Sequence, residues 1–104
     1  MEIINKGEFL IVLLSGEIDH HALKTLRGTI DAQLEHYTPR VLVLDFEKVG
    51  FMDSSGIGLI LGRKRIAESF GGKVVVKGAS GRVEKMLHLA GLGFLISKKV
   101  TSAN

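Results

Sequence analysis

Short, mostly apolar runs alternate along this chain with segments in which apolar residues recur every three or four positions. The runs cover residues 9–14, 41–44, 73–76 and 94–96, after an initial pair formed by Ile3 and Ile4. Runs of this length between turn-forming residues predict β-strands that are covered on both faces. The turn at residues 6–8 is tight, so the first two strands should form an antiparallel pair.

Two amphipathic helices are predicted between these strands. The first follows Asp19, a suitable N-cap, and Pro39 prevents it from continuing. The second begins after Asp53 and ends at Gly71 and Gly72. The apolar stripes are Leu23, Leu26, Ile30, Leu34 and Tyr37 in the first helix, and Leu59, Ile60, Ile66, Ala67 and Phe70 in the second.

A third helix is predicted after Ser80, which can act as its N-cap. Its apolar stripe consists of Val83, Met86, Leu87 and Ala90. Gly91 is a natural residue to follow the helix, and Leu92 can then pack back on Leu87, as in a Schellman ending.

The resulting order, ββαβαβαβ, predicts an α/β domain with a mixed, mostly parallel sheet of four to five strands and three main helices. With 104 residues the chain is long enough for one compact domain, residues 1–104, and too short for two. Hydrophobic residues make up 45% of the chain, which is enough for a substantial core.

Charge and composition narrow the function classes. The net charge is +3, but the positive residues are scattered apart from residues 63–65 and 98–99, and there is one tyrosine and no tryptophan. Nucleic-acid binders normally combine a denser basic face with aromatic side chains, so no direct nucleic-acid binding is expected. No apolar run approaches the roughly 18 residues of a membrane helix, and the first residues lack a signal-peptide pattern. We therefore expect a soluble protein of the cytoplasm that does not contact a membrane.

The chain lacks the residue patterns of common catalytic and metal sites. It has no cysteine and no G-x-x-x-x-G-K-[ST] phosphate loop. Neither Ser54 nor Ser55 has the preceding glycine of a G-x-S-x-G nucleophile, and only His88 follows them as a candidate base. His20 and His21 are neighbours on a helix and point in different directions, so they cannot share a metal ion well. We expect no enzyme activity, no cofactor and no metal.

The most informative segment is residues 52–58, Met-Asp-Ser-Ser-Gly-Ile-Gly, where a buried strand leads into the second helix. The free N–H groups at a helix start favour negative charge. One interpretation is simple capping, for which Asp53, Ser54 or Ser55 would each suffice. Because one cap is enough, at least one hydroxyl should be free, and the other interpretation is a serine that carries a phosphate. The chemistry alone allows either serine.

The helix that follows these serines is rich in glycine. Each interior glycine costs up to about 1 kcal/mol relative to alanine. Gly58 and Gly62 lie four residues apart on one face, and Ile57 and Leu61 form a second pair with the same spacing. This face predicts a docking surface that another backbone can approach closely. The alternative is a second layer of packing inside the domain.

Three segments resemble the bacterial anti-sigma factor antagonists, which are built on the STAS domain. Residues 15–21, Ser-Gly-Glu-Ile-Asp-His-His, resemble the loop after the family's second strand. Residues 51–58 resemble its phosphorylation motif, and residues 90–92, Ala-Gly-Leu, resemble its late A/S-G-L element. The match covers nearly the whole chain and is most similar to the sporulation branch, which counters the anti-sigma kinase of the forespore.

The resemblance implies a partner switch. The unphosphorylated protein binds an anti-sigma factor that is also a serine kinase, and this frees a sigma factor. The kinase uses ATP to phosphorylate the antagonist, and a serine phosphatase resets it. Ser54, the first serine of the motif, is implied as the acceptor. The expected partner-binding residues are Asp19, Asp53, Ser54, Ser55, Gly56, Ile57, Gly58, Leu61 and Gly62.

Two other functions compete with the switch. A STAS-type module could bind a nucleotide or small anion at the start of the second helix, where Gly56 leaves room. A detached regulatory domain of a transporter is not favoured, because this sequence contains no membrane segment.

Overall fold

The computed structural model describes residues 1–97, which fold into one sheet and its helices. The elements in chain order are β1 (Glu2–Lys6), β2 (Phe9–Ile18), α1 (His20–Tyr37), β3 (Val41–Met52), α2 (Ser55–Ser69), β4 (Lys73–Lys77), α3 (Gly81–Leu89) and the 3₁₀ helix η1 (Gly93–Leu95). The sheet order is β1-β2-β3-β4, with β1 antiparallel to β2 and the remaining neighbours parallel. The predicted mixed, mostly parallel α/β fold is confirmed.

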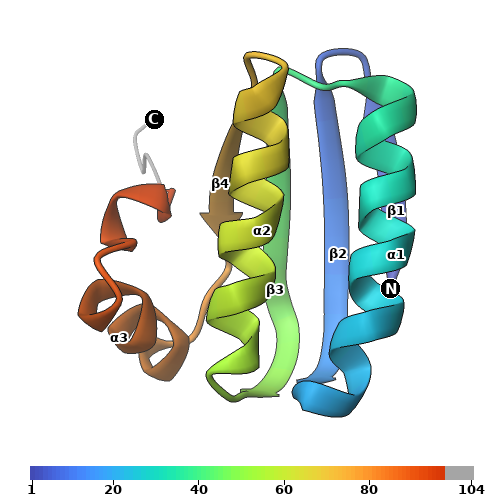
Figure 1. The fold of residues 1–104 in the computed structure, drawn as a ribbon. Coiled ribbons are helices and arrows are strands. Elements are labelled where there is room, and N and C mark those ends of the chain that lie inside the picture. Colours follow the sequence, from blue (N-terminus) through green and yellow to red (C-terminus); the bar gives the residue numbers. More distant parts are fainter. Residues whose placement is uncertain (98–104) are drawn as a thin grey trace, which may run out of the picture.

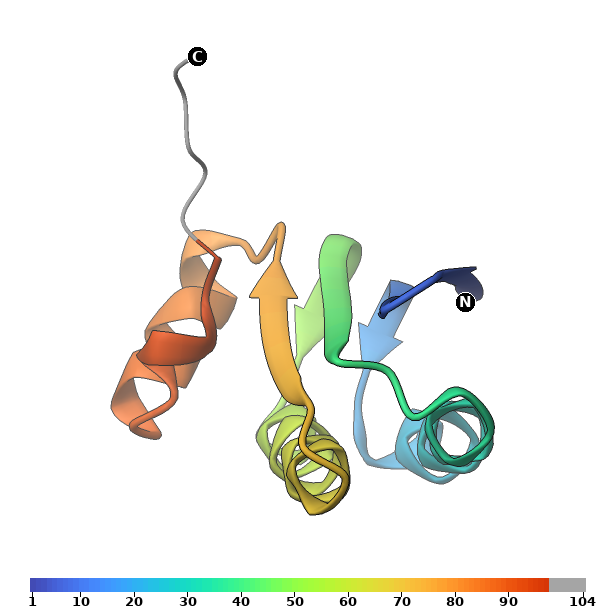
Figure 2. The ribbon, with the colours of Figure 1, turned by 90° about the horizontal axis from the view of Figure 1, so that it is seen from above.

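The two long helices cover only one face of the sheet (Figure 1). Seen from above, α1 and α2 lie side by side beneath the strands, and α3 lies beyond the β4 edge (Figure 2). On the opposite face, Ile11 and Leu13 of β2 and Val43 of β3 are only half-buried. The prediction that the strands are covered on both faces is therefore wrong for the described residues. Those side chains are apolar all the same, which is why the sequence pattern did not alternate.

The predicted last strand at residues 94–96 is also wrong. Phe94 and Leu95 belong to η1 and Ile96 follows it, with Leu95 N–H bonded to Leu92 O (3.0 Å) and Ile96 N–H to Gly93 O (3.1 Å). Leu92 and Leu95 are both buried and three residues apart, which matches the period of a 3₁₀ helix rather than that of a strand. Ile96 then makes a single parallel bridge to Val76.

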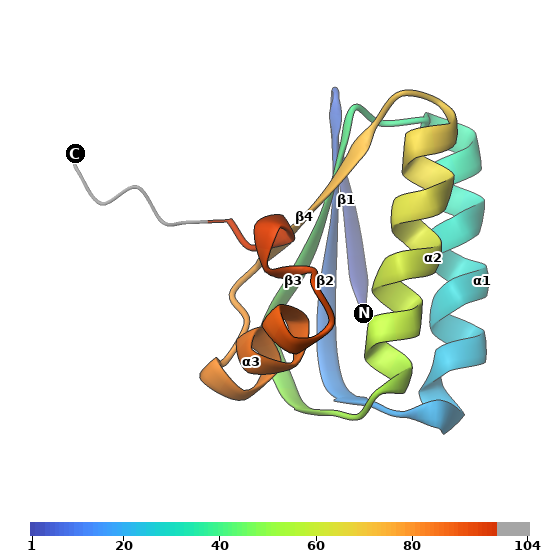
Figure 3. The same ribbon diagram turned by 60° about the vertical axis from the view of Figure 1, so that its left-hand side comes forward.

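Strands β2 and β3 are longer than the apolar runs that predicted them. After Asp45, β3 continues to Met52 and pairs with β2 alone, because β4 ends at Lys77 opposite Asp45. The added stretch contains charged residues and glycine, so its sequence does not read as a buried strand. The register shifts twice along this extension, as β-bulges do. The extension carries the start of α2 well past the end of β4 (Figure 3).

The predicted helix ends are confirmed by their hydrogen bonds. Asp19 Oδ1 accepts from Ala22 N–H (3.0 Å), and Ser80 Oγ accepts from Val83 N–H (3.2 Å). Leu92 N–H donates to Leu87 O (2.8 Å), with φ of +77° at Gly91, as a Schellman ending requires. The capping signals in the sequence therefore place the start of α1 and both ends of α3 within a residue or two.

Between α1 and α2 the core contains a charged side chain that the apolar stripes did not predict. Arg63 is only 5% exposed, and its Nε lies 2.7 Å from Asp31 Oδ1. Its Nη2 donates to Asp31 Oδ2 (3.3 Å) and its Nη1 to Leu59 O (3.3 Å). Burial lowers the pKa of Arg63, and the nearby carboxylate opposes that shift. The basic cluster at residues 63–65 is therefore not a surface patch, since its first member holds the two helices together.

Candidate functional site

The predicted site lies where β2 and β3 end side by side. Ile18 is in register with Met52, and Asp53 N–H donates to Ile18 O (3.1 Å). This bond brings the loop that contains Asp19 next to the loop that contains Asp53. The two segments that the sequence placed in one surface are thus neighbours in the fold, at the carboxyl edge of parallel strands.

Asp53 supplies the cap of α2. Its Oδ1 accepts from Ser55 N–H (2.8 Å), and its carbonyl accepts from Gly56 N–H (3.0 Å). Of the three capping candidates in the sequence, the aspartate therefore takes this role.

The two serines differ in what they offer to another protein. Ser54 is exposed, its backbone is already helical (φ −62°, ψ −17°), and its hydroxyl makes no capping hydrogen bond. Ser55 is half-buried. The sequence left the choice between them open on chemical grounds, and the structure supplies a physical reason to favour Ser54, whose hydroxyl is accessible.

Behind Ser54, one face of α2 is not covered by any other part of residues 1–97. A side chain added at Gly58 or Gly62 would meet no atom within 4 Å. Leu61, between them, is 39% exposed. We call Gly58, Leu61 and Gly62 the glycine strip. Within residues 1–97 these glycines relieve no close contact, so the fold itself does not require them.

Two residues expected on the partner surface are instead used inside the domain. Gly56 is buried, and a Cβ there would overlap the side chain of Met52. Its lack of a side chain serves internal packing and leaves no open cradle for an anion. Ile57 is half-buried and packs against the core, as in the alternative interpretation of packing inside the domain.

Residues 1–103 match the family model of the STAS domain. The chain belongs to the STAS domain family. It is 37% identical over 86 residues to the anti-sigma F factor antagonist of Lysinibacillus sphaericus, covering 83% of this chain and 74% of that protein. It is 39% identical over 83 residues to the protein of the same name from Paenibacillus polymyxa, covering 80% and 71%.

Solved structures of STAS domains are also similar to this chain. The anti-sigma factor antagonist SpoIIAA in its unphosphorylated form is 32% identical, with a TM-score of 0.85 over 96% of this chain and 88% of that one. The phosphorylated form of the Bacillus protein gives 31% identity and a TM-score of 0.78, over 96% and 91%. The STAS domain of a SulP transporter from Vibrio cholerae is also similar, at 29% identity and a TM-score of 0.67 over 90% and 72%. The fold alone therefore does not separate a free regulator from a transporter domain.

The motif of this STAS domain contains one residue whose exposure was not predicted. Phe51 is 43% exposed and lies opposite Glu17 of β2. Neighbouring residues of a strand point to opposite faces, so the burial of Met52 turns Phe51 outward. Strand alternation through the motif would have revealed this, had the length of β3 been known from the sequence.

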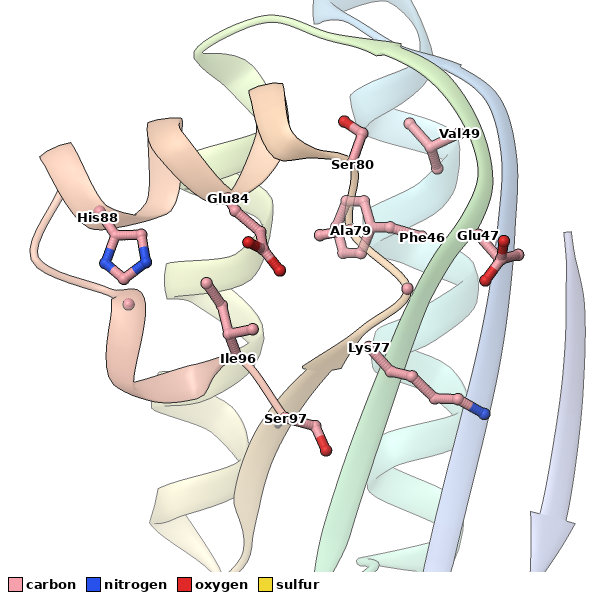
Figure 4. Close-up of a pocket in the computed structure, with 12 residues that line it drawn as sticks. Phe46, Glu47, Val49, Lys77, Ala79, Ser80, Glu84, His88, Ile96 and Ser97 are labelled. Carbon is pink, nitrogen blue, oxygen red and sulfur yellow. The ribbon is translucent and has the colours of Figure 1, made fainter. Parts of the chain in front are cut away.

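A separate pocket of about 760 Å³ lies between β3, the connection from β4 to α3, and α3 itself (Figure 4). Phe46, Ala79, Ser80, Glu84 and His88 line it, among other residues. Its lining includes neither Ser54 nor any residue of the glycine strip.

Neither a cluster of metal-ligating side chains nor a membrane-spanning helix is found in the part of the chain described, residues 1–97. No group of three His, Asp or Glu residues there is arranged to hold a metal ion. His20 and His21 are exposed, with their ring centroids 6.1 Å apart. No helix in that part has the length and apolar character needed to cross a bilayer.

Proposed function

We propose that this protein is an anti-sigma factor antagonist controlled by phosphorylation of Ser54. In its unphosphorylated form it binds an anti-sigma factor that is also a serine kinase, and a sigma factor is released. The kinase transfers phosphate from ATP to Ser54, and a serine phosphatase removes it. The protein itself acts by binding and performs no catalysis.

The observation that carries this proposal is the exposed Ser54 hydroxyl, which makes no capping hydrogen bond and lies beside a helix face that the described residues leave uncovered. An acceptor must be reachable by the kinase, and a docking surface must be free in the unbound protein. The relatives named anti-sigma F factor antagonists supply the class of partner.

Charge explains how phosphate would switch binding off. A phosphate adds about −1.5 to −2 charges at pH 7. Ser54 lies at the start of α2, where the helix dipole and free N–H groups tolerate an anion, so the fold should remain intact. Asp53 is adjacent to it, and Asp19 belongs to the neighbouring loop. A partner packed on the glycine strip would have to bury the new charge close to these carboxylates, which is costly.

The test is phosphorylation by the cognate anti-sigma F factor and ATP, with the modified residue mapped by mass spectrometry. We expect one phosphate per chain, at Ser54, and none in Ser54→Ala, while the matched control Ser55→Ala is modified as the parent is. Ser54→Asp should bind the anti-sigma factor more weakly than Ser54→Ala. Phosphorylation of Ser54→Ala at the parent stoichiometry would show that the acceptor is another residue. Binding of the anti-sigma factor by Ser54→Asp as tightly as by Ser54→Ala would contradict the charge switch.

A second candidate is a module that binds a nucleotide or another small molecule, and the pocket of about 760 Å³ is the observation that favours it. Calorimetry with ATP, GTP and their diphosphates distinguishes the two functions. Micromolar binding that persists after Ser54 is phosphorylated would favour the small-ligand module over the switch.

A further inference from the structure

The connection between β3 and α2 is held by hydrogen bonds to a single residue. The N–H of Asp53 donates to Ile18 O of β2 (3.1 Å), and its carbonyl accepts from Gly56 N–H (3.0 Å). Its carboxylate Oδ1 accepts from Ser55 N–H (2.8 Å). Asp53 is therefore held through its N–H, its carbonyl and its carboxylate. Ser54 lies between Asp53 and the two residues, Ser55 and Gly56, whose N–H groups bind it.

The cap of α2 differs from the caps of the other two helices. Asp19 and Ser80 are ordinary N-caps, with extended backbones and side chains that accept from the N–H three residues later. At α2 the residue in the N-cap position is Ser54, but its backbone is helical and the capping side chain belongs to the residue before it. The shift frees the Ser54 hydroxyl from the capping role that a serine normally takes at this position.

We infer that Asp53 is a positioning residue for the phosphorylation of Ser54, an inference that rests on the function proposed above. Its carboxylate oxygen acts as a hydrogen-bond acceptor that keeps the first turn of α2 formed, so that the hydroxyl is presented in one orientation. In the transfer, a bond forms between Ser54 Oγ and the γ-phosphorus of ATP, and the bond from that phosphorus to the ADP oxygen breaks. The hydroxyl proton passes to a base on the kinase, and Asp53 does not take it.

Two substitutions separate the acceptor oxygen from the charge. Asp53→Asn retains Oδ1, and asparagine is as good a capping residue as aspartate. Asp53→Ala removes the acceptor altogether. Ser80→Ala is the matched control, because it removes one side-chain hydrogen bond at the start of another helix, α3.

The experiment is steady-state phosphorylation by the cognate anti-sigma F factor with saturating ATP and varied antagonist. Loss of one cap costs about 1 kcal/mol, which changes the equilibrium between the ordered and the frayed first turn by roughly fivefold, so kcat should fall for Asp53→Ala by up to about fivefold. The KM for the antagonist should change by less than about twofold, because the glycine strip is intact. Asp53→Asn and Ser80→Ala should retain kcat values close to that of the parent. A general loss of stability would slow Ser80→Ala as well and would not be rescued by asparagine.

Amide hydrogen exchange gives a second, kinase-independent readout. Exchange at Ser55 and Gly56 should become faster in Asp53→Ala and remain at the parent rate in Asp53→Asn. A kcat for Asp53→Asn as low as that for Asp53→Ala would overturn the inference, because the charge would then matter rather than the acceptor. Parent kinetics or parent exchange rates in Asp53→Ala would overturn it too. If the parent itself is not phosphorylated on Ser54, the proposed function fails instead.

Discussion

Replacing the two glycines of the glycine strip by alanine should stabilise this protein and weaken its binding to the anti-sigma factor. An added methyl at Gly58 or Gly62 meets nothing within 4 Å, so it introduces no clash within the described chain. Alanine is about 1 kcal/mol better than glycine in a helix interior. Gly62 is near the middle of α2 and should give most of this gain, whereas Gly58 is in the first turns and should give less.

The gain is large enough to measure. For a domain of this size, about 1 kcal/mol of stability raises Tm by roughly 4–8 °C. Thermal and urea unfolding of Gly58→Ala, Gly62→Ala and the double variant should therefore show increases in Tm and in the unfolding midpoint. Binding should change in the opposite direction, since an extra methyl in a closely packed interface costs about 1–3 kcal/mol. That cost corresponds to a Kd raised roughly fivefold to a hundredfold, measurable by titration calorimetry.

Two control variants separate the expected gain in stability from the expected loss of binding. Gly28 lies within α1 and also has open space around its missing side chain. Gly28→Ala should raise Tm in the same way without changing the Kd. Gly56→Ala should lower Tm, because its methyl would overlap the Met52 side chain. A double Gly58→Ala, Gly62→Ala variant that is more stable and binds as tightly as the parent would refute the glycine strip as an interface. A less stable double variant would refute the view that the fold does not need these glycines.

Two further predictions concern the fold itself. Asp31→Asn should lower the free energy of unfolding by about 3–5 kcal/mol, because Arg63 would remain buried without its counter-charge; a urea midpoint within error of the parent would contradict this. Gly93→Ala should also destabilise the protein, since its methyl would overlap the His88 ring. Adding His88→Ala should recover most of that loss in a double-mutant cycle, and a purely additive cycle would show that the ring is not the obstacle.

The local signals in the sequence determined the order of the elements because those signals are short-range. Asp19, Ser80 and Gly91 cap or end their helices through hydrogen bonds within a few residues, so their roles can be read from the sequence alone. The apolar runs located the beginnings of the long strands β2 and β3 for the same reason. The tight first turn and the strand–helix alternation then left few topologies to consider.

Other features depend on contacts between segments far apart in the chain, and only the tertiary structure decided them. The length of β3 beyond Asp45 follows from its pairing with β2, not from its own polar composition. Arg63 is buried because Asp31, thirty-two residues away, provides a carboxylate. Residues 94–96 look like a strand by composition, yet Leu92 and Leu95 are drawn into the core with helical spacing.

At the motif, the sequence determined that two hydroxyls and an acid stand at the start of a helix, because residue types alone fix that chemistry. It could not decide which of them was free. That choice depends on the bond from Asp53 to Ile18 of the neighbouring strand, which anchors the aspartate so that its side chain caps α2 in place of Ser54. The exposure of the Ser54 hydroxyl is therefore a consequence of strand pairing, and a local sequence pattern does not predict it.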